Sequence, residues 1–174
     1  ETGSDRLRSA LNKPISNDRI LSAVETAQRC GLPDLKMYFI IGLPGETDDD
    51  LVAIGELLSE SQSIMLRHGR GRGKVGTLHA GCSVLVPKPY TPYSKAAVLT
   101  KREYRRRLGV VEGRLRSIDN LKFDRPSYRE ALWQTILSRG DARTFELVAE
   151  LAAADVGDHL AAPEAPRQHP HQPG

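Results

Sequence analysis

The sequence is poor in the residue that most often builds metal centres and disulfide scaffolds. Its 174 residues include only two cysteines, Cys30 and Cys82, and these are far apart in the chain. Zinc sites and disulfide frameworks need several suitably spaced cysteines, so neither is predicted. Unpaired cysteines are typical of reducing compartments, and we therefore expect a cytoplasmic protein.

The chain also lacks a long apolar run and a strong charge of either sign. No stretch approaches the roughly 20 apolar residues of a membrane helix, so a membrane partner is not expected. The net charge is only +3, which is weak evidence for nucleic-acid binding unless the charge is concentrated. Because the sequence starts without Met and inside an apparent turn, we expect that part of the protein precedes it.

Basic residues gather in one place, residues 67–74, which their glycines predict to be a loop. This segment keeps open an alternative function as a non-catalytic RNA-binding module. It contains no interleaved aromatic residues on which bases could stack. A solvated loop is therefore the simpler interpretation, and nucleic acid is not the expected partner.

What the sequence does contain is a regular alternation of predicted helices and strands. Strands are predicted at 35–41, 75–86 and 121–123. Helices are predicted at 5–13, from Ser16 to Gly31, from Thr47 to the basic segment, and at 100–118, 127–138 and 142–154. Strand, helix and strand in this order predict a parallel sheet.

The most informative stretch runs from Lys36 to Thr47, where an apolar strand enters a Gly-Leu-Pro-Gly turn and an acidic helix start. One interpretation is an ordinary turn in which glycine relieves strain and Thr47 caps the helix. The other is that Gly42 lets a flat ligand contact main-chain amides at the carboxyl end of the strand. The sequence pattern alone leaves both interpretations open.

This stretch resembles the radical S-adenosylmethionine enzymes, which carry a Gly-x-Ile-x-Gly-x-x-Glu pattern on the fifth barrel strand. Ile40 and Gly42 match the second and third positions of that pattern, whereas Tyr38 replaces its first glycine. Gly45 stands where the glutamate would be, and Glu46 follows it. The form Ile-Gly-Leu-Pro-Gly-Glu-Thr is common in a branch whose members often carry an upstream cobalamin-binding domain.

Other segments resemble the same family. Residues 1–7 with Asn12 and Lys13 resemble the segment after the fourth strand, which contacts the ribose and methionine parts of the cofactor. For Ser4, a plain helix cap is the alternative interpretation. Residues 86–93 resemble the loop after the sixth strand, and the likeness extends to about Leu151.

The resemblance implies an α/β fold, namely the C-terminal half of a parallel (β/α) barrel or partial barrel with a helical C-terminal extension. The expected boundaries are 1–98 for the barrel part, 99–157 for the helical extension and 158–174 for a disordered tail. The expected partner is the missing N-terminal half of the barrel. On the helix at 100–118, the apolar stripe at Tyr104 and Leu108 takes the buried side. The opposite, wet face is therefore expected to carry Lys101, Arg102, Arg105, Arg106 and Arg107.

The resemblance also implies S-adenosylmethionine and a 4Fe–4S cluster as cofactors, with cobalamin as a candidate in the whole enzyme. The cofactor-binding residues it implies are Glu1, Ser4, Ile40, Ile41, Gly42 and Leu43. The cluster needs three cysteines on one loop, which the family places upstream of Glu1, so no catalytic or metal-binding residue is assigned here. We expect the chain alone to be inactive, and the substrate is not predicted.

A rival interpretation is a metal-free barrel enzyme such as an aldolase or isomerase. Such an enzyme needs a poised base or Schiff-base lysine at the carboxyl ends of its strands. Lys36 stands at the opposite end of its predicted strand, and Lys88 is a weak candidate.

Overall fold

The computed structural model describes residues 1–159, with side chains as far as residue 154. The chain divides into two compact units, Glu1–Ser138 and the part from Arg139 onward. Residues 160–174, which hold most of the predicted tail, lie outside the described residues. The sequence-based boundaries at 98 and 157 therefore stay predictions.

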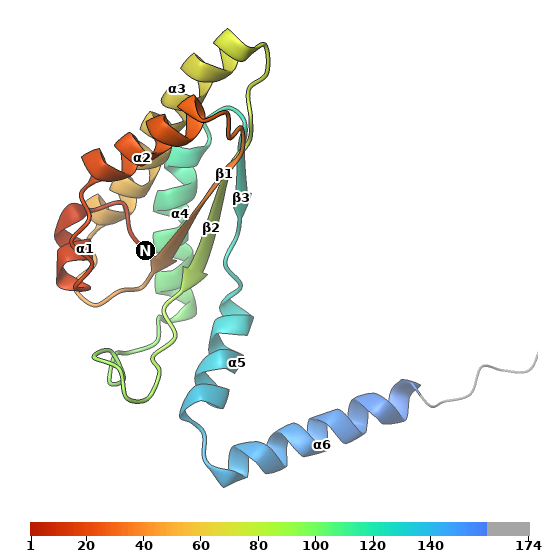
Figure 1. Ribbon diagram of the computed structural model, residues 1–174. Coiled ribbons are helices and arrows are strands. Elements are labelled where there is room, and N and C mark those ends of the chain that lie inside the picture. Colours follow the sequence, from red (N-terminus) through yellow and green to blue (C-terminus); the bar gives the residue numbers. More distant parts are fainter. Residues whose placement is uncertain (160–174) are drawn as a thin grey trace, which may run out of the picture. The chain divides into compact units, whose positions relative to one another are not determined.

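The first unit contains a three-stranded sheet and the helices around it (Figure 1). Its strands are β1 (Leu35–Ile41), β2 (Leu78–Val84) and β3 (Leu121–Asp124). Its helices are α1 (Asp5–Ala10), α2 (Asn17–Arg29), α3 (Asp48–Arg72), α4 (Lys101–Leu115) and α5 (Tyr128–Arg139).

The predicted parallel sheet is confirmed. The strands lie in the order β1-β2-β3, and both neighbouring pairs run parallel. The register places Leu78 beside Leu35 on one side and beside Leu121 on the other. The second strand is shorter than predicted, since Val75 and Gly76 lie before it. The chain is therefore a mixed α/β protein, as expected.

The helices begin where short polar side chains accept hydrogen bonds from backbone N–H groups. Ser16 accepts from the N–H of Arg19, and Thr47 accepts from that of Asp50. Thr100 caps α4 in the same way through the N–H of Glu103. Each cap satisfies a donor that helix geometry leaves unpaired, which explains why these starts were readable from the sequence.

The prediction of a loop at 67–73 is wrong, because α3 continues to Arg72 and ends at Gly73 in the left-handed conformation. Tertiary contacts to α2 hold this part helical. Arg67 and His68 both contact the carboxylate of Glu25, and Arg72 donates to the carbonyl and side-chain oxygens of Gln28. The basic segment is thus a helix end with partners and not the loop that the RNA-binding alternative assumed.

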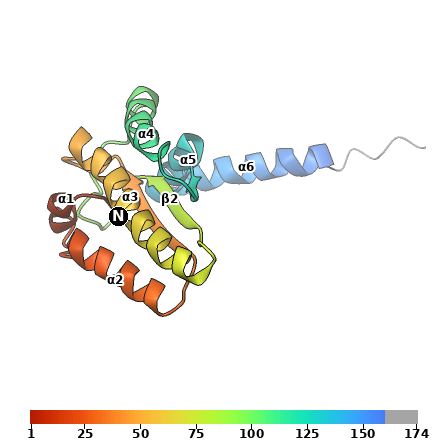
Figure 2. The same cartoon turned by 90° about the horizontal axis from the view of Figure 1, so that it is seen from above.

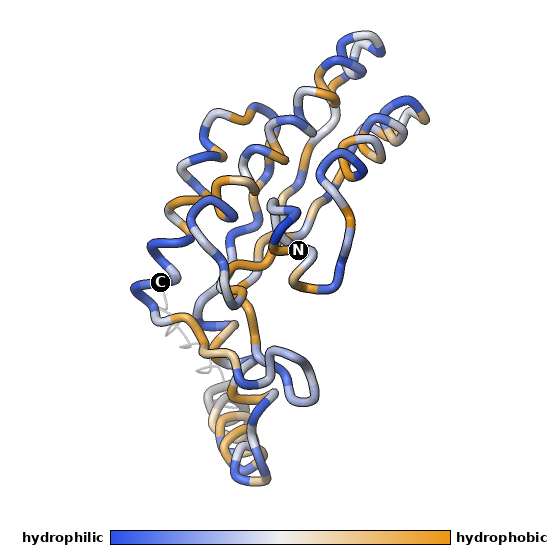
Figure 3. The backbone as a smooth tube through the Cα atoms, turned by 90° about the vertical axis from the view of Figure 1, so that its left-hand side faces the viewer, coloured by the Kyte–Doolittle hydropathy of each residue, from blue (hydrophilic) through white to orange (hydrophobic). Residues whose placement is uncertain are grey.

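One face of the sheet packs against helices. Figures 1 and 2 show α2, α3 and α4 on the same side of the strands. The buried core on this side includes Phe39 and Ile41 of β1, Leu58 of α3, Leu78 of β2 and Val111 of α4. In Figure 3 apolar and hydrophilic residues alternate along the helices, as expected for helices with one buried side.

The opposite face of the sheet is not covered by α2, α3 or α4, and we call it the open face. Strand alternation and the parallel register assign to it three rows of side chains. These rows are Lys36, His79 and Lys122, then Tyr38, Gly81 and Asp124, then Ile40 and Ser83. Tyr38 is 67% exposed. Parallel sheets are normally covered on both faces, so this exposure is unusual.

The second unit contains α6 (Ala142–His159). Asp141 precedes it and accepts hydrogen bonds from the backbone N–H of Arg143 and from that of Thr144. Several large apolar residues of α6 are exposed, with Phe145 at 74%. Among the described residues, no helix is both long and apolar enough to cross a membrane.

Candidate functional site

The turn after β1 has a backbone that favours glycine at two positions. Gly42 has φ +90° and Gly45 has φ +75°, both in the left-handed region. A Cβ atom at Gly42 would lie 2.9 Å from two side-chain carbons of Leu99, whereas one at Gly45 would meet open space. Gly42 is therefore required by both conformation and space.

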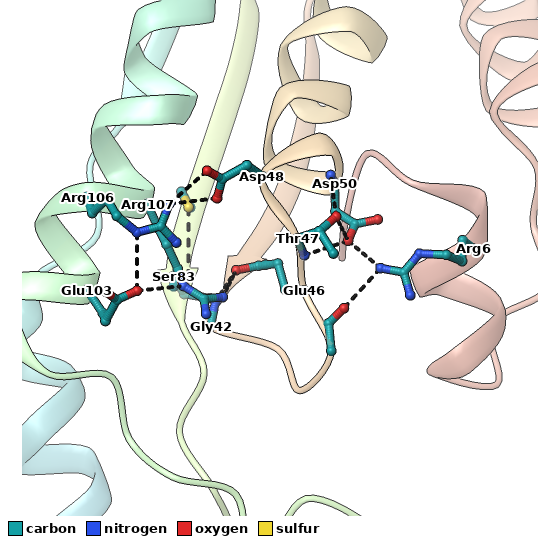
Figure 4. Close-up of polar contacts among 12 residues, drawn as sticks. Arg6, Gly42, Glu46, Thr47, Asp48, Asp50, Ser83, Glu103, Arg106 and Arg107 are labelled. Carbon is teal, nitrogen blue, oxygen red and sulfur yellow. Dashed lines mark hydrogen bonds and ion pairs between the residues drawn. The ribbon is translucent and has the colours of Figure 1, made fainter.

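Glu46 ties this turn to α4 (Figure 4). Its side chain is only 1% exposed. The carboxylate accepts the Gly42 N–H at 2.9 Å and a guanidinium N–H of Arg107 at 2.6 Å. Burial raises the pKa of Glu46 above its usual value, although the bonds from Gly42 and Arg107 act in the opposite direction. The turn thus depends on a carboxylate that is costly to keep charged.

Asp50 ties the other side of the turn to α1. Its carboxylate accepts the backbone N–H of Thr47, and the Thr47 hydroxyl accepts the backbone N–H of Asp50. The two residues thus form a capping box. Arg6 binds the same carboxylate and also donates to the Gly45 carbonyl at 3.0 Å. Burial raises the pKa of Asp50, but hydrogen bonds from Ser4, Thr47 and Arg6 outweigh it and bring the pKa to about 2.

The sequence predicted Arg107 on the wet face of its helix, and this prediction is wrong. Its side chain is 18% exposed and pairs with Glu46, and its Nε atom lies 3.7 Å from Glu103. Its neighbour Arg106 does face solvent and pairs with Asp48 at 2.6 Å. The charge pattern of α4 carried no sign of this difference, because the buried partner comes from a turn far away in sequence.

The structure places the predicted backbone residues of the turn largely inside the protein. Ile41 is 0% exposed and belongs to the packed side, and Leu43, which follows β1, is 3% exposed. The Gly42 N–H, which the ligand interpretation offers to a flat molecule, is bonded to Glu46. Ile40 differs from them, because its side chain lies on the open face.

The two predicted polar residues near the start have partners within the chain. Ser4 caps α1 and accepts the N–H of Leu7 at 3.2 Å, which matches the plain structural interpretation. Its hydroxyl also bonds to the Asp50 carboxylate at the start of α3. The Glu1 carboxylate pairs with Lys13, and this contact lowers the pKa of the Glu1 carboxyl group.

The backbone of Glu1 lies along the outer edge of β1. Its amino group donates to the Tyr38 carbonyl at 3.0 Å, and its carbonyl accepts the Ile40 N–H at 2.8 Å. One residue that bonds to both neighbours of a second residue is the repeating unit of a parallel ladder. Glu1 thus occupies the position of a strand residue opposite Phe39.

A cavity of about 400 Å³ lies on the open face. Its lining includes two of the predicted residues, Glu1 and Ile40, and also Tyr38, Ser83, Asp124 and Arg125. The volume is in the range of small-molecule sites. Asp124 and Arg125 were not predicted, because β3 is short and only its pairing with β2 brings its end to this face.

Tyr38, Gly81 and Asp124 form one row of the open face, and all three line this cavity. A Cβ atom at Gly81 would lie 3.0 Å from Cδ1 of Tyr38, so glycine lets the ring lie against β2. Lys36 lies beside this row, with its Nζ 5.2 Å from the Tyr38 ring centroid and 2.9 Å from Asp124. The Lys36 ammonium lowers the pKa of Asp124 below its usual value.

Neither cysteine is arranged for metal binding. Burial raises the pKa of the Cys82 thiol to about 12, so Cys82 is a neutral thiol at neutral pH. Cys30 is exposed at the end of α2. In the part of the chain that the structure describes, no group of three His, Cys, Asp or Glu residues could hold a metal ion.

Comparison with known proteins connects the first third of the chain to one family. Residues 1–58, which include β1 and the Gly42 turn, match the model of the Radical SAM superfamily. This match confirms the resemblance predicted from the sequence.

Two curated relatives are similar to longer parts of the chain. An uncharacterized protein of Methanocaldococcus jannaschii is 26% identical over 81% of this chain and 29% of its own length. The tRNA-2-methylthio-N(6)-dimethylallyladenosine synthase of Agrobacterium fabrum is 31% identical over 44% of this chain and 18% of its own length. The chain thus spans less than a third of either relative. No solved structure matches it.

Proposed function

We propose, from the match of residues 1–58 to the Radical SAM superfamily, that this chain forms part of the cofactor- and substrate-binding wall of a radical S-adenosylmethionine enzyme. The observation that carries the proposal is that residues of the matched segment line a cavity on the open face. Glu1 and Ile40, two residues assigned from the family pattern, line that cavity.

The outer edge of β1 supports a partial barrel that continues beyond this chain's own sheet. Glu1 makes both hydrogen bonds of a parallel ladder with β1, so a strand that ended at Glu1 would pair with β1 in a defined register. We propose that the N-terminal half of the barrel supplies this strand. Sheet closure of this kind removes an exposed edge.

The open face supports the same architecture. In a parallel barrel one face of the sheet packs against helices and the other lines the interior. The helix-packed face here is apolar, whereas the open face carries charged residues, a tyrosine and a serine. Such a face is better suited to line an interior in which a ligand binds than to pack against a second layer of helices.

Within this wall, we propose that Ile40 provides the apolar surface for the adenine of S-adenosylmethionine. Its side chain lies beside Tyr38 and Ser83 in the same cavity. The Gly42 N–H is taken up by Glu46, so its contribution is to the shape of the turn rather than to a ligand bond. Glu1 and Ser4 then hold the neighbouring edge in place.

The iron–sulfur cluster does not fit the residues of this chain. A 4Fe–4S cluster that leaves one iron open needs three cysteine thiolates, and the sequence has two widely separated cysteines. The cluster would therefore be held by residues outside this chain. The chain resembles a branch whose members often carry a cobalamin-binding domain upstream. We therefore assign no residue of this chain to cobalamin.

The proposal predicts that S-adenosylmethionine cleavage needs more than this chain. The 174-residue chain, reconstituted with iron and sulfide under anaerobic conditions, should form no 5′-deoxyadenosine. A longer polypeptide that adds a three-cysteine loop should form it after reduction. Cleavage by the isolated chain, or a longer polypeptide with an intact cluster that neither binds nor cleaves S-adenosylmethionine, would overturn the proposal.

A further inference from the structure

Glu46 and Arg107 form a buried contact that differs from the other charged contacts around the turn. Their side chains are 1% and 18% exposed, whereas those of the neighbouring pair Asp48–Arg106 are 59% and 44% exposed. Both pairs join the start of α3 to the same turn of α4 (Figure 4). The exposed pair therefore offers a control from the same two elements.

The buried contact acts directly on the conformation of the turn. Glu46 accepts the N–H of Gly42, the residue whose φ of +90° lets β1 leave the sheet and start the turn. Arg107 fixes the carboxylate from α4 at 2.6 Å. Leu99 packs where a Gly42 side chain would be, so the turn is held from the α4 side by one bond and one apolar contact.

The groups around Glu46 determine how well its negative charge is compensated. Arg107 faces it from α4, with Glu103 behind, and Asp50 faces it from α3 as a like charge. Cys82 of β2 lies close enough for the Glu46 charge to raise the thiol pKa, and burial raises the pKa of Glu46 itself. Only Arg107 among these groups carries a compensating positive charge.

We propose that Glu46 and Arg107 are positioning residues that hold the Gly42 turn in its ligand-binding shape. The inference rests on the proposed function, because the turn borders the wall assigned to the adenosine. Removing either partner removes the charge-assisted bond between Glu46 and Arg107. The turn then loses its polar tie to α4.

The test uses the cluster-bearing polypeptide that contains this chain, with S-adenosylmethionine as the probe in equilibrium binding. Glu46→Gln keeps an acceptor for the Gly42 N–H but removes the charge, and Arg107→Met removes the cation. Because misplacement of a positioning contact costs up to about a hundredfold, we expect each variant to bind about tenfold to a hundredfold more weakly. Asp48→Asn and Arg106→Met should bind as the unchanged protein does.

A comparison of affinity with stability separates a positioning role from general support of the fold. In Glu46→Gln the affinity should fall while the melting temperature near neutral pH does not, because the amide avoids the cost of burying a charge. Arg107→Lys, which keeps the charge, should restore most of the affinity and also serves if Arg107→Met does not fold. Equal affinities in Glu46→Gln and Asp48→Asn, or no recovery of affinity in Arg107→Lys, would overturn the inference.

The outcome is distinguishable from failure of the proposed function. If the unchanged polypeptide does not bind S-adenosylmethionine at any pH, the proposed function fails. If it binds and the Glu46 and Arg107 variants bind equally well, only the positioning role fails.

Discussion

The two faces of the sheet carry different kinds of side chains, although they belong to the same strands. The helix-packed face is made of fully buried apolar residues such as Ile41, Leu78 and Ala80, all at 0% exposure. The open face carries Lys36, Tyr38 and Asp124 in contact with one another and with solvent. The difference indicates that stability lies on the packed face, whereas residues of the open face are available for binding.

The largest expected effect tests the packed face. Leu58→Ala removes a side chain with no exposed surface and leaves a cavity, so we expect the free energy of unfolding to fall by about 2–5 kcal/mol. The matched change on the open face is Tyr38→Ala, which should alter it by less than about 0.5 kcal/mol because the ring is 67% exposed. Chemical denaturation of both variants measures this, and equal losses would break the comparison.

The next effect concerns the buried carboxylate Asp50 at the junction of α1 and α3. Its folded pKa of about 2 lies below the ordinary aspartate value of 3.8, so its contribution to stability is present above pH 3.8 and lost as pH falls towards 2. A shift of this size corresponds to about 2 kcal/mol. The difference in unfolding free energy between the unchanged chain and Asp50→Asn should therefore shrink between pH 4 and pH 2. A difference that stays constant with pH would contradict the assignment.

Glu46 should show the opposite sign. Because its folded pKa is raised above 4.5, its contribution to stability is present below pH 4.5 and is lost as pH rises through the folded pKa. Relative to Glu46→Gln, the unchanged chain should therefore lose stability on going from pH 4.5 towards neutrality. Thermal unfolding of the two proteins across this range provides the measurement. A gain over the same interval would show that the Arg107 contact outweighs the cost of burial.

A smaller effect concerns the glycines of the turn. Gly42→Ala should cost about 1–2 kcal/mol, from a left-handed conformation and from displacement of Leu99. Gly45→Ala carries only the conformational cost, since its added Cβ would meet open space, and should cost about 1 kcal/mol. If the two variants unfold at the same denaturant concentration, Leu99 yields without cost.

The smallest effect on stability tests the open face directly. Asp124→Asn removes the partner of Lys36, yet both groups face solvent, so the melting temperature should not change measurably. If the cavity above them binds ligand, the same variant should weaken S-adenosylmethionine or substrate binding in the longer polypeptide. A clear drop in melting temperature together with unchanged binding would reverse the roles assigned to the two faces.

The sequence by itself determined the local features of this protein. Apolar content and flanking turns predicted β1 with its observed ends, and Ser16, Thr47 and Thr100 marked helix starts because a cap bonds only to residues three positions away. The Gly42 turn and its family resemblance were also readable, since they lie within a single stretch of chain.

Only the tertiary structure decided features that depend on distant partners. Gly69 lies in a helix whose neighbouring residues are bound by α2, and its missing side chain leaves room for Lys74 and Val75. The Arg107 side chain turns inward because it bonds to the buried carboxylate of Glu46, 61 residues away in the sequence. The open face became visible only when three strands were aligned. Burial and charge pairing are properties of what lies opposite a residue, and the order of residues along the chain does not contain that information locally.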